Sequence, residues 1–182
     1  MSDLKTKVMS IEQGRYMYDR AAKLLLSDIQ LLSRIMHSVI PEYRDISIKD
    51  IEGNYIQLSS VSISKIGVAD ITPIAQKNTS HRPELLNTED VGLNEANIYY
   101  DILFKAKAPV CNDEKIDFII NIEAQRSVHT SYPLEKRAEY YGARLLSSQL
   151  KTINGDTDYD SLSKVYSIWI CMNSAKDMAG HV

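Results

Sequence analysis

The feature that most constrains the fold is a pair of segments rich in β-branched and aromatic residues, separated by a short segment with turn chemistry. Residues 96–107 contain neither Gly nor Pro, and the same holds for residues 115–125. Residues 108–114 (APVCNDE) lie between them and include Pro, Asn and Asp, which favour turns. Strand-forming segments on both sides of a turn predict an antiparallel hairpin.

Helical patterns precede and follow this hairpin. Apolar residues recur at three- and four-residue spacing within residues 17–40, where Ser27 can act as an N-cap and Pro41 follows the end. Residues 133–150 form a second predicted helix, with Pro133 in its first turn. We expect this helix to pack on the sheet.

A nearly continuous apolar run at residues 165–172 predicts a strand buried on both faces in the interior of the same sheet. The signals within residues 42–95 are weaker, and predict short strands or turns followed by a loop. The element order predicts an α/β fold: a mixed sheet with a central antiparallel hairpin flanked by helices. We expect one domain over residues 1–182, with an N-terminal helical part at 1–45 and a core at 96–172.

Composition and charge narrow the classes of function. The chain has 182 residues, of which 44% are hydrophobic and 25% charged, as in an ordinary soluble domain. A net charge of −3 gives no global attraction to nucleic acid, so a nucleic-acid interface requires a local basic patch. No apolar stretch approaches the roughly 20 residues that span a bilayer, and no signal-peptide pattern is present. We therefore expect no membrane partner and a cytoplasmic location.

The hairpin carries a candidate metal site. Glu123 and Gln125 are two residues apart on one strand, so they project from the same face with the carbonyl of Ala124 between them. If the turn is centred near Cys111, Asp101 falls opposite Asn121 and diagonal to Glu123, roughly 7 Å away. Two carboxylates and a carbonyl suit Mg²⁺, which would lower the pKa of a bound water.

Without the ion, the two carboxylates would repel each other, and the pKa of one would be raised. Removing one of them should then not lower stability. The alternative is a solvated hairpin face, on which charged residues need no function. Tyr99, Leu103 and Ile119 share that face, which favours acids that are at least partly buried.

The helix at 133–150 offers a basic surface. Arg137 and Arg144 lie on one flank, with Lys136 and Tyr140 further around. These residues either form a solvated helix face or contact DNA, with Lys136 or Arg137 bound to a phosphate. Further basic residues lie nearby in the chain: Lys105, Lys107 and Arg126.

Taken together, residues 94–172 resemble the PD-(D/E)xK nuclease superfamily, in its branch of recombination-promoting nucleases and transposase-like proteins. The segments that carry the resemblance are 99–104 (YYDILF), 120–125 (INIEAQ), 132–141 (YPLEKRAEYY) with 147–149 (SSQ), and the strand at 165–172.

The resemblance implies a restriction-endonuclease-like core and a magnesium-dependent DNA endonuclease, with Mn²⁺ as an alternative ion. Asp101 and Glu123 would bind the metal together with the Ala124 carbonyl. Gln125 stands where the superfamily commonly has lysine; it can orient a water but supplies no positive charge. Lys136 or Arg137 could supply that charge. Glu95 and Asp28 are candidates for a further upstream acid.

Members of this branch are longer than the chain, which favours a fragment or a degenerate copy. The alternative function is therefore a nuclease-derived binding or assembly module that has lost catalysis. Metal binding at Asp101 and Glu123 separates the two functions. The sequence leaves open whether the protein forms a homodimer.

Overall fold

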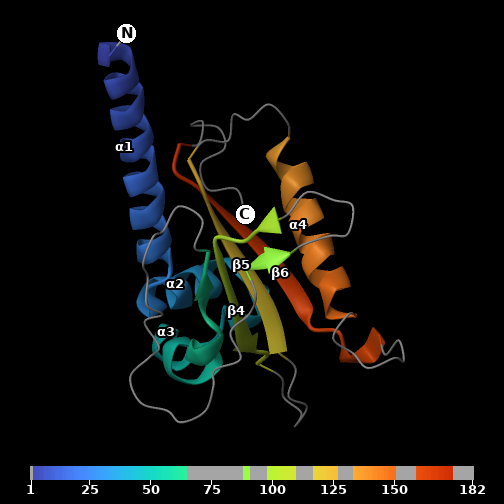
Figure 1. Cartoon of the computed structure of the whole chain (residues 1–182). Coiled ribbons are helices and arrows are strands. Elements are labelled where there is room, and N and C mark those ends of the chain that lie inside the picture. Colours follow the sequence, from blue (N-terminus) through green and yellow to red (C-terminus); the bar gives the residue numbers. More distant parts are fainter. Residues whose placement is uncertain are drawn as a thin grey trace.

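The structure is a computed structural model in which residues 2–64, 88–90, 98–109, 117–126, 133–150 and 159–173 are described. Helices flank a sheet (Figure 1). The helical elements are α1 (Ser2–Leu26), α2 (Ile29–Val39), η1 (Pro41–Tyr43), α3 (Ile48–Asp50), η2 (Ile51–Tyr55), η3 (Leu58–Ser60), α4 (Leu134–Gln149) and η4 (Tyr159–Ser161). The strands are β1 (Ser62–Ile63), β2 (Glu89–Asp90), β3 (Ile98–Tyr99), β4 (Ile102–Lys107), β5 (Asp117–Gln125) and β6 (Lys164–Cys171).

The described residues form a mixed α/β fold around a four-stranded sheet with the order β1-β4-β5-β6. Strands β4 and β5 pair antiparallel, and β6 runs parallel to β5. The predicted pairing of the two central segments and the mixed character of the sheet are confirmed. Most of the segment between β4 and β5 lies outside the described residues.

The two faces of the sheet are covered by different helices, so α1 and α2 lie on the side opposite α4 (Figure 1). Ile102, Phe104, Ile120 and Ile122 pack with α2 residues in the larger core cluster. On the other face, Leu103 and Ile119 pack with Tyr141 and Leu145 of α4. The predicted packing of the 133–150 helix on the sheet is confirmed. None of the helices in the described part of the chain has the length and apolar character needed to cross a bilayer.

The predicted helical character of residues 17–40 and its end before Pro41 are confirmed, but the capping residue is wrong. The segment is divided between α1, which begins at Ser2, and α2, which begins after a break at Ser27 and Asp28. The N-cap of α2 is Asp28, whose carboxylate accepts hydrogen bonds from the N–H groups of Gln30 and Leu31. The Ser27 hydroxyl instead donates to the Leu24 carbonyl at 2.8 Å, which satisfies the end of α1. Short helical turns occupy most of residues 41–60, where strands or turns were predicted.

The predicted strand at 96–107 is interrupted at Tyr100 and Asp101. β3 pairs with β2 in a separate two-stranded ribbon, and the N–H of Tyr100 donates to the Thr88 carbonyl at 2.9 Å. β4 begins only at Ile102.

The register also differs from the prediction. Leu103, rather than Asp101, lies opposite Asn121, and Ile102 lies opposite Ile122. Asp101 precedes Ile102 and Glu123 follows Ile122, so the two acids lie opposite each other one step beyond the last pair of the ladder.

β6 is the edge strand among the described strands, so its predicted interior position is wrong. Of its residues, only Ile168 is buried. Its apolar sequence has another cause: Val165 and Trp169 pack against the α4 side of the sheet, while Tyr166 and Ile170 pack against the opposite core. Both faces of the strand are covered even though one of its edges has no described neighbour.

Candidate functional site

Asp101 and Glu123 meet where β4 begins and β5 approaches its end. The main-chain N–H of Asp101 donates to Oε1 of Glu123 at 3.2 Å, and the N–H of Ala124 donates to Oδ2 of Asp101 at 3.0 Å. Glu123 is 3% exposed, and the Asp101 side chain is 16% exposed. The alternative of a solvated hairpin face is therefore wrong, because Glu123 is buried and Asp101 is largely covered beside it.

The interruption of the predicted strand explains how Asp101 reaches this position. The N–H of Ala124 points towards β4, at the point where the next ladder bond would form. The chain leaves the ladder at Tyr100 to join β2, so the Asp101 side chain accepts that hydrogen bond instead. The Asp101 carbonyl accepts a bond from the N–H of Ser64 at 2.9 Å, which fixes its backbone on the β1 side.

Lys23 of α1 supplies the positive charge at the acid pair. Its Nζ lies 2.9 Å from Oδ1 of Asp101 and 2.9 Å from Oδ2 of Asp19, and its side chain is buried. Burial lowers the pKa of Lys23, but the neighbouring Asp101 and Asp19 carboxylates outweigh burial and raise it overall. Lys23 is therefore a buried ammonium shared by two acids from different elements.

Sequence reasoning missed Lys23 and Asp19. The available signal was a lysine within an apolar helical stripe, since Ala22, Lys23 and Leu26 are all buried on α1. Asp19 lies four residues before Lys23 on the same helix face, which is the spacing of a helical ion pair. The pattern predicts a buried, paired lysine, but it does not say that Asp101 is the second partner.

Glu123 has a strongly perturbed pKa. The pKa of its carboxyl is raised from 4.5 to about 8. Burial is the larger cause, and the nearby Asp101 charge is the second. The Asp101 N–H and the positive Arg137 guanidinium act in the opposite direction. The prediction that one acid of the pair has a raised pKa is confirmed, and at pH 7 Glu123 holds its proton.

Asn121 lies on the same strand face as Glu123, two residues earlier, and is completely buried. Neither atom of its amide makes a hydrogen bond of normal length within the described part of the chain. The amide still lies near enough to Glu123 to favour the ionised carboxylate and lower its pKa. The Asn121 amide therefore lies beside Glu123 with both its donor and its acceptor available for a hydrogen bond.

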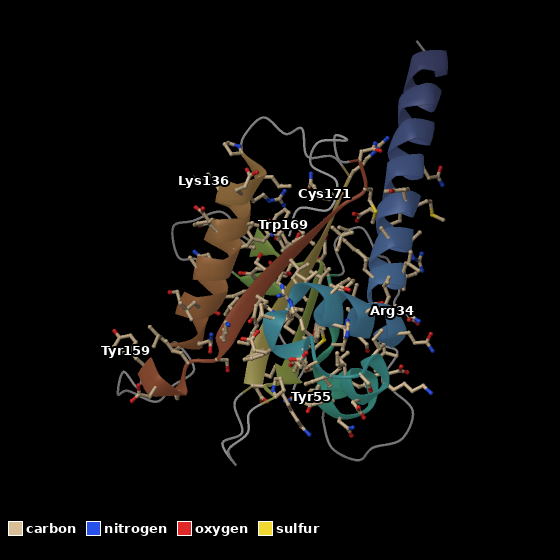
Figure 2. All side chains as sticks on the ribbon, turned by 180° about the vertical axis from the view of Figure 1, so that it is seen from behind. Arg34, Tyr55, Lys136, Tyr159, Trp169 and Cys171 are labelled. Atoms are coloured by element: carbon tan, nitrogen blue, oxygen red, sulfur yellow. The ribbon has the colours of Figure 1, made fainter. Side chains whose placement is uncertain are left out.

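Arg137 is the basic residue of α4 that faces the site. Its guanidinium lies over the rings of Tyr141 and Trp169, 5.0 Å and 5.1 Å from their centroids, and Nη2 donates to the Tyr141 hydroxyl at 2.8 Å. Lys136 lies at the outer side of the first turns of α4 (Figure 2), where it pairs with Glu139 at 2.9 Å. Tyr140 is exposed on the same helix. Arg137 thus belongs to the site, whereas Lys136 and Tyr140 lie on the outer surface.

The remaining predicted residues are dispersed. Gln125 follows Glu123 by two residues on β5, so strand alternation directs it to the same face. Asp28 caps α2 and is not an upstream acid of the site. Glu95 lies outside the described residues. Arg126 is exposed on the side of α1, where it lines a cavity with Tyr18.

The oxygen donors at the site are of the type that a hard cation prefers, but they are few. Asp101 and Glu123 provide two carboxylates, and magnesium sites often use one or two, completed by water and substrate oxygens. Within the described ranges, no group of three or more His, Cys, Asp or Glu side chains is arranged to hold a metal. Lys23 is the present counter-ion of Asp101. An ion at this site would compete with the Lys23 ammonium for Asp101 and with a proton for Glu123.

The chain matches no protein-family model, and comparisons with curated proteins and with solved structures found no match. The function therefore has to be inferred from the side chains themselves.

Proposed function

We propose that the chain is a magnesium-dependent DNA endonuclease of the PD-(D/E)xK superfamily, in its recombination-promoting branch. In this proposal, β4, β5, β6 and α4 serve as a restriction-endonuclease-like core. The observation that carries it is the contact between Asp101 and the buried Glu123, two acids joined through main-chain hydrogen bonds at a strand end. Burying a carboxyl is costly, and such pairs are common where a protein holds a cation or moves a proton.

The side chains of Asp101 and Glu123, with the Ala124 carbonyl, would hold the ion. In a strand, the N–H and C=O of one residue point to the same side. Because the Ala124 N–H points at Asp101, its carbonyl lies on that side too. When bound, Mg²⁺ would acidify a water ligand and offset charge on the scissile phosphate. Gln125 would orient the attacking water through its amide.

Lys23 would provide the cation that Gln125 cannot. It is buried and charged, and its pairing with Asp19 would keep it beside the site when an ion competes for Asp101, where it could stabilise a developing negative charge. This assignment replaces the expectation that Lys136 or Arg137 compensates for the missing motif lysine. Lys136 is exposed and already paired with Glu139.

Arg137 would contact a phosphate of the DNA strand on the α4 side. Stacking on Tyr141 and Trp169 orients its guanidinium, the side-chain group best suited to binding phosphate. Lys136 and Tyr140 would add contacts further along the backbone, where charge positions DNA without reading its sequence.

The direct test is cleavage of plasmid and oligonucleotide DNA by purified protein with Mg²⁺, Mn²⁺ or a chelator. The matched control is the Glu123→Gln variant, which keeps the shape of the protonated acid but cannot become a carboxylate. We expect metal-dependent cleavage by the wild type and none by Glu123→Gln. Equal residual cleavage by both proteins would identify a contaminating nuclease and contradict the proposal.

A second candidate is a nuclease-derived binding or assembly module without catalysis. It is favoured by Lys23, which already neutralises Asp101 without any metal. Calorimetric titration with Mg²⁺ and Mn²⁺ separates the two candidates. Absence of both metal binding and cleavage would favour the binding module.

A further inference from the structure

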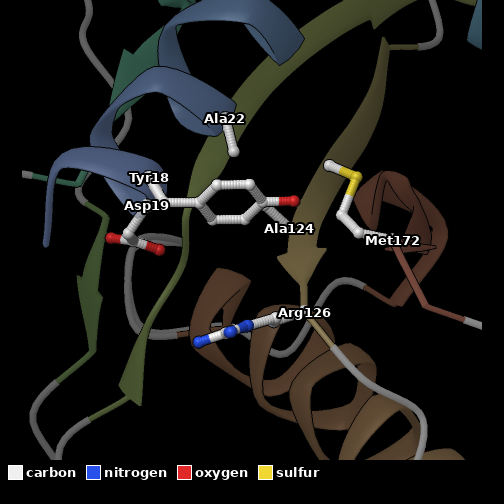
Figure 3. Close-up of a pocket in the computed structure, with 6 residues that line it drawn as sticks. All are labelled: Tyr18, Asp19, Ala22, Ala124, Arg126 and Met172. Carbon is white, nitrogen blue, oxygen red and sulfur yellow. The ribbon is translucent and has the colours of Figure 1, made fainter. Parts of the chain in front are cut away.

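A cavity of 410 Å³ lies on the α1 side of the candidate site. Tyr18, Asp19 and Ala22 of α1 form one wall, and Ala124, Arg126 and Met172 at the ends of β5 and β6 form the other (Figure 3). This volume falls within the range of roughly 300–1,000 Å³ that is typical of small-ligand sites.

The lining combines a flat ring, a thioether and a guanidinium. Tyr18 is 50% exposed and Met172 is 37% exposed, so both present apolar surface. Arg126 extends beside the Tyr18 ring in Figure 3. An aromatic ring takes a stacked base of any sequence, and arginine binds phosphate through paired N–H donors. The Asp19 carboxylate would repel a phosphate, and Lys23, which lies 2.9 Å away and is shared with Asp101, offsets part of that repulsion.

Two residues connect the cavity with the acid pair. The N–H of Ala124 donates to Oδ2 of Asp101, and Asp19 shares Lys23 with that same carboxylate. Ala124 faces α1, whereas Glu123 faces α4, so a ligand in the cavity would lie on the α1 face of the sheet, next to the Asp101 carboxylate rather than the Glu123 side chain.

We propose that this cavity binds one unpaired nucleotide of the DNA strand next to the cleavage position. Its base stacks on Tyr18 beside Met172, and its phosphate pairs with Arg126. Inside a duplex, neighbouring bases cover both faces of each base, so stacking at a position within a strand requires an unpaired nucleotide. The substrate class is then DNA with a single-stranded end, gap or flap. This inference deepens the proposed endonuclease function and rests on it.

The test is binding of fluorescent oligonucleotides in chelator, so that binding is measured without cleavage. The DNAs are a single strand, a duplex with a single-stranded overhang, and a blunt duplex. We expect the first two to bind more tightly than the blunt duplex. Tyr18→Ala should weaken binding of the overhang DNA roughly tenfold or more, while Tyr18→Phe keeps the ring and the affinity.

Arg126→Ala provides a second variant, with a reduced salt dependence of binding expected from the loss of one phosphate contact. Tyr159→Ala and Arg44→Ala are the matched controls, because both side chains are exposed away from the cavity. Tighter binding of the blunt duplex, or equal losses in the Tyr18 and Tyr159 variants, would overturn the subsite. Equal binding of a free nucleoside monophosphate would also overturn it, by showing that no strand is required.

Cleavage, measured separately with Mg²⁺, distinguishes this inference from the proposed function. Tyr18-dependent binding without cleavage would support the subsite and reject the endonuclease. Metal-dependent cleavage with unchanged binding by Tyr18→Ala and Arg126→Ala would support the endonuclease and reject the subsite.

Discussion

The main-chain N–H of Asp101 donates to the Glu123 carboxyl at 3.2 Å, and the Asp101 carboxylate accepts from the N–H of the residue after Glu123 at 3.0 Å. Each acid is therefore held by the backbone of the other strand. The ladder contributes further, since Ile102 and Ile122 pair immediately beside the site. The hydrogen bonds that position the two carboxyls are therefore made by the backbone itself.

The raised pKa of Glu123 predicts that stability falls as pH rises. Its pKa is about 8 in the folded protein and near the ordinary 4.5 when unfolded, so the folded state holds a proton that the unfolded state loses between these values. The free energy of unfolding should therefore decrease from about pH 4.5 to pH 8 through this group. At roughly 1.4 kcal/mol per tenfold change in proton affinity, the decline amounts to a few kcal/mol. Glu123→Gln should remove it in urea titrations across this range, and an unchanged pH profile in that variant would contradict the assignment.

Metal binding should release a proton near neutral pH. Glu123 must lose its proton to become a ligand, so Mg²⁺ affinity should rise from pH 6 to about pH 8 and then level off. Calorimetry in buffers of different ionisation enthalpy measures the number of protons released, which should approach one at pH 7. If affinity does not change with pH, Glu123 is not a ligand of the ion.

Asp101→Ala and Glu123→Ala should each abolish magnesium-dependent cleavage, and the double variant should be scarcely worse, because the two acids act as one unit. Their stabilities should differ. The structure corrects the expectation that removing either acid leaves stability unchanged, since Asp101 pairs with buried Lys23 and binds the Ala124 N–H. We expect Asp101→Ala to cost on the order of 2–4 kcal/mol, and Glu123→Ala less. Equal losses by chemical denaturation would argue against the Lys23–Asp101 pair.

Lys23→Met should leave Asp101 without its ammonium partner, so the variant should be less stable than wild type in chelator. If Mg²⁺ binds at Asp101, it can replace that charge and should raise the melting temperature of Lys23→Met more than that of wild type. Lys49→Met is the matched control, because Lys49 is exposed on α3. A magnesium response that is the same in all three proteins would place the ion elsewhere.

Gln125→Lys tests where the positive charge of the site comes from. Alone, it should leave cleavage unchanged or moderately higher, because Lys23 already lies beside Asp101. In the Lys23→Met background, it should restore much of the lost cleavage by placing a cation beside Glu123. Cleavage rates of the four proteins form a double-mutant cycle, and the absence of coupling between the two positions would reject this role for Lys23.

The sequence by itself determined three of the four strands of the sheet, β4, β5 and β6, and the identity of its two acids. Strand propensity on both sides of a turn was sufficient for β4 and β5, because local preference and antiparallel pairing agree there. The apolar run of β6 predicted a buried strand, and the apolar face of α4 predicted a helix packed on the sheet. Asp101 and Glu123 stood out because carboxylates occupied strand positions whose neighbours, such as Leu103 and Ile119, were apolar.

Only the tertiary structure decided which groups meet those acids. The register depends on where the chain leaves the ladder, and here the bond from Tyr100 to Thr88 diverts it, which brings Asp101 beside Glu123. Lys23 is 78 positions before Asp101 in the chain, so no local pattern can join them. Their contact results from α1 packing across the end of the sheet, where burial makes a paired charge far less costly than a lone one. Burial also raises the pKa of Glu123. The degree of burial depends on the packing of the surrounding elements, so the neighbouring residues in sequence do not determine it.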